Sequence, residues 1–330
     1  MEKAPIITTP TKRRLSVTIH GESIGISMRY IKEFISCFPK DQLEGKSTSK
    51  VCYEIIEPMT RELSCSHVDY YRSMREGQES ALDGSLYGRA NVFVSHAWAS
   101  PFLDLVDALE VWQQRRRGSD RVGKEQGKVV EMDVAEEQEE WYFWIDLFIV
   151  NQHDTEERPF DWWETLFRSS MCDIGRALVV LNPWNAPVYA TRAWCLYELS
   201  IVIQSDIPCE IILSSSQWSL LLDYLAHCDD SAVVGGGMAI QAITHIDIGK
   251  ATASKEQDLK NIMTIVKKSV GISRLNQEVI RALLKWMVGV GLTQHDNLSD
   301  EEQARSKSYL GLLILEGQSG IGEFSTLSFR

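Results

Sequence analysis

Two neighbouring segments specify the architecture of this chain: Ala177-Leu178-Val179-Val180-Leu181 and, after a loop, Trp194-Cys195-Leu196-Tyr197-Glu198-Leu199-Ser200-Ile201-Val202-Ile203. The first segment is short and continuously apolar, which is typical of a central parallel strand covered on both faces. The second segment is largely apolar all round at helical spacing, so it predicts a buried helix. A buried strand followed by a buried helix indicates an α/β fold.

Glu198 is the only charged residue in the second segment. Burying an unpaired carboxylate is costly, so such a group is normally paired, protonated or functional. Two interpretations stay open at this point. In the structural one, an arginine or backbone amides hold Glu198; in the functional one, its carboxyl group serves a site.

Strand-like and helix-like segments alternate on both sides of this pair. Further strands are expected at residues 90–95, 141–146, 209–213 and 244–248, with helices between them. This alternation predicts an α/β fold with a flavodoxin-like, doubly wound, parallel five-stranded sheet in the order 2-1-3-4-5. Helical extensions are expected at both ends of the chain, including a helix at residues 24–38 and another at 277–290.

The segments predict four regions along the chain. Residues 1–46 form an N-terminal extension that is expected to be partly disordered, and residues 47–89 form a helical lead-in. Residues 90–270 form the α/β domain, and residues 271–330 form a helical tail. A charged stretch at 115–140 has little periodicity, so it is expected to be a solvated, mobile insertion in the α/β domain.

Composition narrows the classes of function. The 330 residues carry a net charge of -12, which argues against nucleic-acid binding because that requires a basic face. No apolar stretch approaches the ~20 residues that span a bilayer, and residues 1–14 have no signal-peptide core. The seven cysteines are scattered without a CxxC pair, which indicates reduced thiols and no zinc site. We therefore expect a cytoplasmic protein with no membrane partner, no metal and no bound cofactor.

Polar and aromatic residues follow the first three strands of the expected α/β domain. Open α/β sheets bind ligands outside the carboxyl ends of their strands, where the strand order reverses. Tryptophan rings there offer flat stacking surfaces. The substrate-binding candidates beside Glu198 are Ser95, His96, Trp98, Asp146, Trp184 and Trp194. For His96 and His153, a structural role is favoured over an acid–base or metal role, because nothing fixes a ligand spacing.

Three runs resemble the signature boxes of Toll/interleukin-1 receptor (TIR) domains. They are Asn91-Val92-Phe93-Val94-Ser95-His96-Ala97-Trp98, then Trp144-Ile145-Asp146, then Leu178-Val179-Val180-Leu181-Asn182-Pro183 continued by Arg192-Ala193-Trp194-Cys195-Leu196-Tyr197-Glu198-Leu199. The set is similar to a divergent TIR-like group of algae and other protists that precedes kinesin-light-chain-like tetratricopeptide repeats. The resemblance covers about residues 47–290. It departs from the usual TIR pattern at Asn151-Gln152-His153, where a glycine is common.

The tail carries a second, partial resemblance. Leu310-Gly311-Leu312-Leu313, Glu316-Gly317-Gln318 and residues 322–330 look like the start of such a repeat, although Phe324 stands where a small alanine is usual. One repeat cannot bury its own apolar face, so the array is expected to be truncated.

The TIR resemblance implies a signalling domain that self-associates and cleaves NAD, as a substrate, to nicotinamide and ADP-ribose products. It implies that Glu198 is the catalytic residue, and the tail resemblance implies protein partners for the tail. Because fold does not fix activity, two alternatives remain. One is a non-catalytic TIR-type interaction module, and the other is a different nucleotide- or nucleoside-processing enzyme on a flavodoxin-like fold.

Overall fold

The structure is a computed structural model that describes residues 18–19, 22–75, 86–122, 140–155, 157–227 and 246–295. Four sequence predictions lie wholly or partly outside these residues. They concern the start of the partly disordered N-terminal extension (1–17 and 20–21), most of the charged insertion (123–139), the start of the fifth strand (244–245) and the partial repeat in the tail (310–330).

The strands of the described residues form one mixed seven-stranded sheet in the order β1-β2-β5-β4-β6-β7, with β3 also paired to β2. The strands are β1 (Thr18–Ile19), β2 (Glu22–Ile26), β3 (Tyr87–Arg89), β4 (Val92–Ser95), β5 (Phe143–Trp144), β6 (Ala177–Val180) and β7 (Cys209–Ile212). β4 to β7 are parallel, whereas β2 runs antiparallel to β1, β3 and β5. The α/β class is confirmed, but the prediction of an all-parallel sheet is wrong.

The parallel strands follow the chain order second, first, third, fourth, as expected for those four strands. The fifth expected strand is not formed within its described part. Residues 246–247 have no strand pairing, and Ile248–Lys250 form a short 3-10 helix, η5. The Asp247 side chain caps this helix by accepting a hydrogen bond from the Gly249 amide at 2.9 Å. Such local capping competes with strand pairing.

The N-terminal extension supplies β1 and β2 of the antiparallel part of the sheet, and the end of the lead-in supplies β3. A helix was expected at residues 24–38, but β2 ends at Ile26 and helix α1 spans Met28–Ser36. Ser27 separates the two because its side chain accepts a hydrogen bond from the Tyr30 amide at 3.2 Å, as a helix N-cap does. A Cβ atom at Gly25 would lie 2.9 Å from backbone atoms of Ala90 and Tyr142, so only glycine permits this close pairing.

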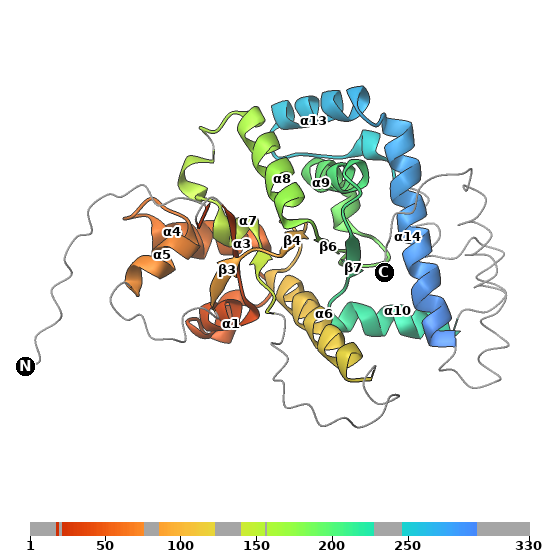
Figure 1. Ribbon diagram of the computed structural model, residues 1–330, viewed down its shortest axis with the longest axis horizontal. Helices are drawn as coiled ribbons and strands as arrows, with labels where there is room; N and C mark the ends of the chain where they lie inside the picture. The colour runs from red at the N-terminus through yellow and green to blue at the C-terminus, as the bar shows by residue number, and fades with distance from the viewer. Residues whose placement is uncertain are drawn as a thin grey trace, which may run out of the picture.

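Helices cover both faces of the sheet (Figure 1). α8, α9 and α13 pack together on one face, and α1, α6 and α10 lie on the other. α14 contacts α9, α10 and α13 and so passes beside both layers. The longer helices besides α1 are α5 (His67–Met74), α6 (Phe102–Val122), α8 (Phe160–Ile174), α9 (Ala193–Gln204), α10 (Ser215–His227), α13 (Glu256–Lys268) and α14 (Ile272–His295).

Short helical segments complete the described chain. They are α2 (Lys40–Leu43), α3 (Thr48–Val51), the π-helix η1 (Cys52–Ile56), α4 (Glu57–Thr60), α7 (Asp146–Ile149), and the 3-10 helices η3 (Gln152–Asp154) and η4 (Val188–Thr191). α3, η1 and α4 form the first part of the helical lead-in that was expected at residues 47–89. Pro58 has no backbone N–H to donate, and the wider turns of η1 end just before it.

The start of the predicted charged insertion is an ordered part of α6. The Arg115 guanidinium lies 3.9 Å from the centre of the Trp218 ring on α10, and Arg116 forms an ion pair with Glu210 of β7. Cation–π and ion-pair contacts of this kind hold basic side chains against the fold. Residues 115–122 therefore continue helix α6, whereas the sequence placed the start of the charged insertion at residue 115.

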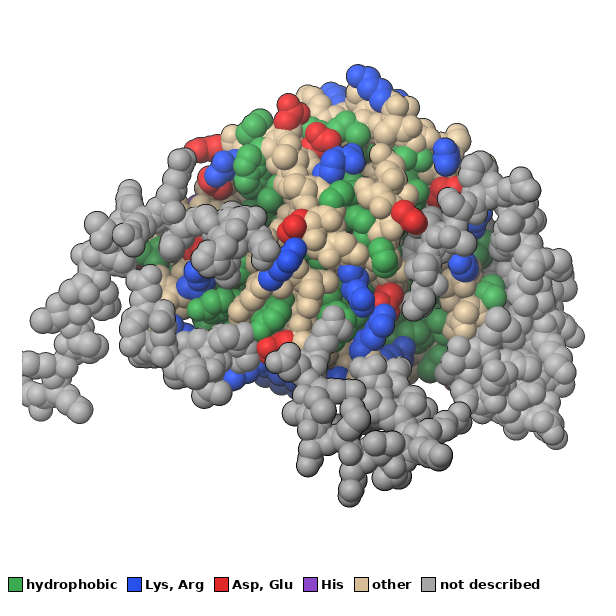
Figure 2. Space-filling view, in the orientation of Figure 1, with side chains coloured by type: hydrophobic (Ala, Val, Ile, Leu, Met, Phe, Trp, Pro, Cys, Tyr) green, Lys and Arg blue, Asp and Glu red, His purple; other side chains and the backbone are tan. Residues whose placement is uncertain are grey.

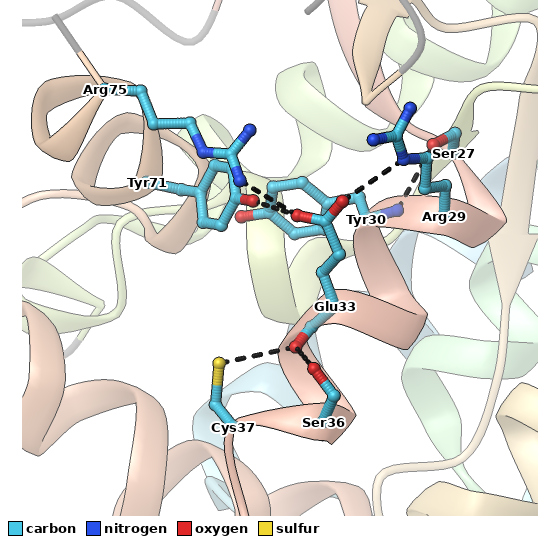
Figure 3. Close-up of polar contacts among 8 residues, drawn as sticks. All are labelled: Ser27, Arg29, Tyr30, Glu33, Ser36, Cys37, Tyr71 and Arg75. Atoms are coloured by element: carbon cyan, nitrogen blue, oxygen red, sulfur yellow. Dashed lines mark hydrogen bonds and ion pairs between the residues drawn. The ribbon is translucent and has the colours of Figure 1, made fainter. Parts of the chain in front are cut away.

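Glu33 ties α1 to the end of α5 (Figure 3). Its carboxylate accepts hydrogen bonds from Arg29 Nε at 3.2 Å, from Arg75 at 3.0 Å and from the Tyr71 hydroxyl. The Arg75 guanidinium also lies 4.7 Å from the centre of the Tyr71 ring. The lead-in helices are thereby packed on the N-terminal extension.

On the face drawn in Figure 2, acidic and basic side chains are interspersed over the described surface. Hydrophobic side chains lie between them in small groups. None of the helices among the described residues combines the length and the apolar character needed to cross a bilayer.

Candidate functional site

Glu198 lies in the second turn of α9, and its carboxyl group reaches the carboxyl end of β4. There Glu198 Oε2 is hydrogen-bonded to Ser95 Oγ. Glu198 is 7% exposed, and burial raises the pKa of its carboxyl group to about 8. The Ser95 hydrogen bond lowers that pKa, while the Asp146 carboxylate raises it. The group is therefore mostly a neutral acid at pH 7.

No lysine or arginine forms an ion pair with Glu198 among the residues that the structure describes. The arginine-held version of the structural interpretation thus finds no support there. A buried acid without a cation is compatible with the functional interpretation and with a neutral acid held by structural hydrogen bonds.

Tyr189 of η4 is a site residue that the sequence interpretation missed. Its hydroxyl lies 2.8 Å from Ser95 Oγ and donates a hydrogen bond to the Cys195 carbonyl at 2.9 Å. Burial raises the pKa of the Tyr189 phenol well above its ordinary value, so the hydroxyl keeps its proton. The sequence offered one weak signal, a tyrosine in the proline-containing loop between β6 and α9.

His96 and Asp146 form the second polar group of the site. His96 Nε2 lies 4.0 Å from Asp146 Oδ1 and is buried without a hydrogen-bond partner in the described part of the chain. Burial lowers the pKa of His96, and the nearby Asp146 carboxylate only partly opposes this. The imidazole is therefore neutral at pH 7, with one ring nitrogen available to a small polar partner.

Asp146 also holds Trp98. The Trp98 indole N–H donates to Asp146 Oδ2 at 2.8 Å, and the Leu147 amide donates to Asp146 Oδ1 at 2.8 Å. Trp98 is only partly buried, and its ring centre lies 6.4 Å from that of the exposed Tyr53. The ring is thus fixed in orientation and retains exposed surface.

Five of the predicted residues lie near the point where the strand order reverses: Ser95, His96, Trp98, Asp146 and Glu198. Ser95 and His96 end β4 or follow it, Asp146 follows β5, and Glu198 lies on the helix after β6. β5 and β6 flank β4 on opposite sides. This is the edge of an open α/β sheet where ligands bind.

Two predicted residues, Trp184 and Trp194, are engaged elsewhere. The Trp194 indole N–H lies 3.3 Å from Asp258 of α13, and its ring packs between Phe160 and Phe167 of α8. The Trp184 ring packs against Tyr224 of α10, with their centres 5.1 Å apart. Among the described residues neither indole is hydrogen-bonded to Glu198, and both rings take part in the packing of helices.

The remaining imidazole and thiol candidates have structural contacts. His153 Nε2 lies 2.7 Å from the Thr60 hydroxyl, which ties the loop after β5 to α4. The Cys195 thiol donates to the His96 carbonyl at 3.4 Å, and burial raises its pKa well above the ordinary value. A protonated, buried thiol is a poor nucleophile. The described residues contain no group of three or more His, Cys, Asp or Glu side chains arranged to hold a metal ion.

The arrangement combines a buried neutral acid, an unpaired imidazole nitrogen and an oriented indole. Such a set can hydrogen-bond a polar substrate, stack on a planar ring and stabilise a developing positive charge once the acid ionises. No protein-family model, curated protein or solved structure matches the chain.

Proposed function

We propose that this chain is a TIR-like signalling domain that cleaves NAD to nicotinamide and ADP-ribose products, with Glu198 as the catalytic residue. One observation carries the proposal. A buried carboxyl group without a cationic partner among the described residues contacts the end of the central strand β4, beside the point where the strand order reverses.

The chemistry suits a carboxyl group of this kind. Loss of nicotinamide leaves an oxocarbenium-like ribose, whose positive charge a nearby carboxylate stabilises. The nicotinamide ring of NAD is itself cationic, and an approaching positive charge favours the ionised form of Glu198. The substrate would therefore convert the resting acid into the carboxylate that the reaction needs.

The other residues take supporting roles in this proposal. Ser95 and the free His96 nitrogen offer hydrogen bonds to the substrate, and Trp98, held by Asp146, offers a ring for a base to stack on. Trp184 and Trp194 have no substrate contact in it. Self-association, a cytoplasmic location and protein partners for the tail belong to the same proposal and rest on the sequence resemblance.

A non-catalytic interaction module is the second candidate. It is favoured by the closure of the site, because Glu198 is 7% exposed and Ser95 bonds its carboxyl group. The apolar pocket lined by Val179, Leu199 and Leu283 does not include Glu198. In this alternative the acid has a structural role, and the domain acts through assembly alone.

The deciding experiment measures nicotinamide released from NAD by the purified full chain, with and without a crowding agent that promotes assembly. Wild-type protein is expected to release nicotinamide, and Glu198→Gln to do so at least ~100-fold more slowly, because the charge-stabilising group is lost. Glu164→Gln, on the α8 surface, is the matched control and should retain activity.

Two outcomes contradict the proposal. Assembled wild-type protein without turnover would favour the interaction module. Cleavage of other nucleosides or nucleotides in preference to NAD would favour a different processing enzyme on the same fold.

A further inference from the structure

Four groups at the site form one unbranched chain of hydrogen bonds. It runs from the Glu198 carboxyl group to Ser95 Oγ, on to the Tyr189 hydroxyl at 2.8 Å, and ends at the Cys195 carbonyl at 2.9 Å. All four residues are buried, and they come from β4, η4 and α9. The chain therefore links the strand end to the helix that carries the acid.

Three contacts need three protons, and counting the available protons gives each bond a direction. A carbonyl oxygen can only accept hydrogen bonds. The Tyr189 hydroxyl therefore uses its single proton to donate to the Cys195 carbonyl oxygen. The Ser95–Tyr189 bond must then use the single proton of Ser95. With Glu198 as a carboxylate, Ser95 is the donor of the bond between them, and no proton remains for the Ser95–Tyr189 contact. A proton on Glu198 removes this shortage, because the acid then donates to Ser95.

We propose that Glu198 rests as a neutral carboxylic acid that donates to Ser95, and that Tyr189 is the positioning residue that maintains this state by engaging the Ser95 proton. Ser95 is thereby prevented from donating to the carboxyl group. The inference is independent of the substrate, since it concerns the resting charge of the site.

A Ser95 hydrogen bond to the carboxylate lowers the pKa of Glu198, and Tyr189 competes for the Ser95 proton. The other charged and titratable neighbours leave the neutral acid favoured. Asp146 from α7 bears a negative charge that disfavours a second carboxylate. Burial keeps Tyr189 of η4 and Cys195 of α9 protonated, and it keeps His96 after β4 neutral. The Arg192 cation at the start of α9 lowers the pKa of the Cys195 thiol, but burial raises that pKa more strongly. Burial also raises the pKa of Glu198 to about 8.

A cationic ligand is expected to reverse the hydrogen bond between Glu198 and Ser95. A ligand that brings a positive charge to Glu198 favours its ionisation, and the released proton leaves to solvent. Ser95 then turns its hydroxyl towards the carboxylate, because a charged acceptor forms the stronger hydrogen bond. Binding of a cationic ligand should therefore release protons below the wild-type titration midpoint.

Infrared spectroscopy of the full chain tests the charge state directly. A protonated buried carboxyl group gives a C=O stretch that is absent from a carboxylate, and loss of the band in Glu198→Gln assigns it. The wild-type band is expected to persist at pH 7 and to disappear with a midpoint near 8. In Tyr189→Phe the midpoint should fall by about one pH unit or more, because Ser95 becomes free to donate to the carboxylate.

Tyr197→Phe is the matched control, because it removes a buried tyrosine hydroxyl beside Trp194 rather than in the chain. Its midpoint should equal that of wild type. A wild-type protein without the Glu198 band at pH 6 would overturn the proposal without any variant, even if Tyr189→Phe failed to fold. An unchanged midpoint in folded Tyr189→Phe, or an equal shift in Tyr197→Phe, would overturn the role of Tyr189.

Discussion

The Glu198 carboxyl group is buried with no cation paired to it among the described residues, so its ionisation opposes folding. Its pKa rises from an ordinary 4.5 to about 8 in the folded protein. Between these values the folded state binds more protons than the unfolded state. The contribution of this group to stability is therefore greatest at low pH and is lost as the pH rises through that window.

Substituting Glu198→Gln should make this dependence visible. The variant keeps a neutral hydrogen-bonding side chain, so its free energy of unfolding should increase relative to wild type by on the order of 3 kcal/mol between pH 4.5 and pH 7. Urea unfolding of both proteins at several pH values measures the difference, and effects of other groups cancel. A difference that is independent of pH would mean that Glu198 is already ionised in the folded protein.

The sequence pointed to some residues of the site and missed others for a physical reason. Ser95 and Glu198 could be predicted because strand ends and the following helix meet at one edge of a parallel sheet. The contacts of Tyr189 and Trp194 depend on tertiary placement. The Trp194 indole N–H donates a hydrogen bond to Asp258 of α13, a helix that comes much later in the chain. No local pattern reports such a partner.

At the scale of elements, β2 shows why a helix was expected where a strand exists. Residues 24–38 contain apolar residues at helical spacing, and α1 does use those from Met28 onward. Ser27 as an N-cap marks the boundary locally, because its partner is the Tyr30 amide, whereas the need for Gly25 depends on backbone distant in sequence. Gly25 is needed because β3 and the segment before β5 lie against it, which the sequence alone does not show.

Gly25→Ala is expected to destabilise the protein by about 1–3 kcal/mol, because the new methyl group would lie 2.9 Å from backbone that cannot rotate away. Gly289→Ala in α14 is the matched control, since a Cβ atom there meets nothing within 4 Å. Alanine should stabilise that helix by about 0.5–1 kcal/mol. Thermal unfolding compares the two, and a neutral Gly25→Ala would contradict the close pairing of β2.

At the scale of the whole molecule, the N-terminal extension belongs to the same sheet as the parallel strands. The buried residues Ile24, Ile26, Tyr30, Ile31 and Phe34 join one hydrophobic core with those of β4 to β7. The sequence predicted an N-terminal extension (1–46) and a helical lead-in (47–89), because the alternation of strands and helices begins only at residue 90. β2 pairs with β5, which is far away in the sequence, and such pairing produces no periodic pattern within either strand.

A chain that begins at residue 47 is therefore expected not to fold, because it lacks β2, α1 and their share of the core. Loss of near-ultraviolet circular dichroism and of cooperative unfolding, relative to the full chain, would report this. Cooperative unfolding of the shortened chain with a native-like spectrum would show that the parallel strands form an independent unit.

The pairing of Ile26 with Phe143 has a consequence for synthesis. As the chain leaves the ribosome, β2 is complete long before β5 has been synthesised. The edge of β2 and the apolar side of α1 therefore lack their packing partners during that interval. Non-local pairing of this kind slows folding and exposes strand edges in the interval. Co-translational folding of this molecule thus starts at its first strands but cannot close around them until the second parallel strand has emerged.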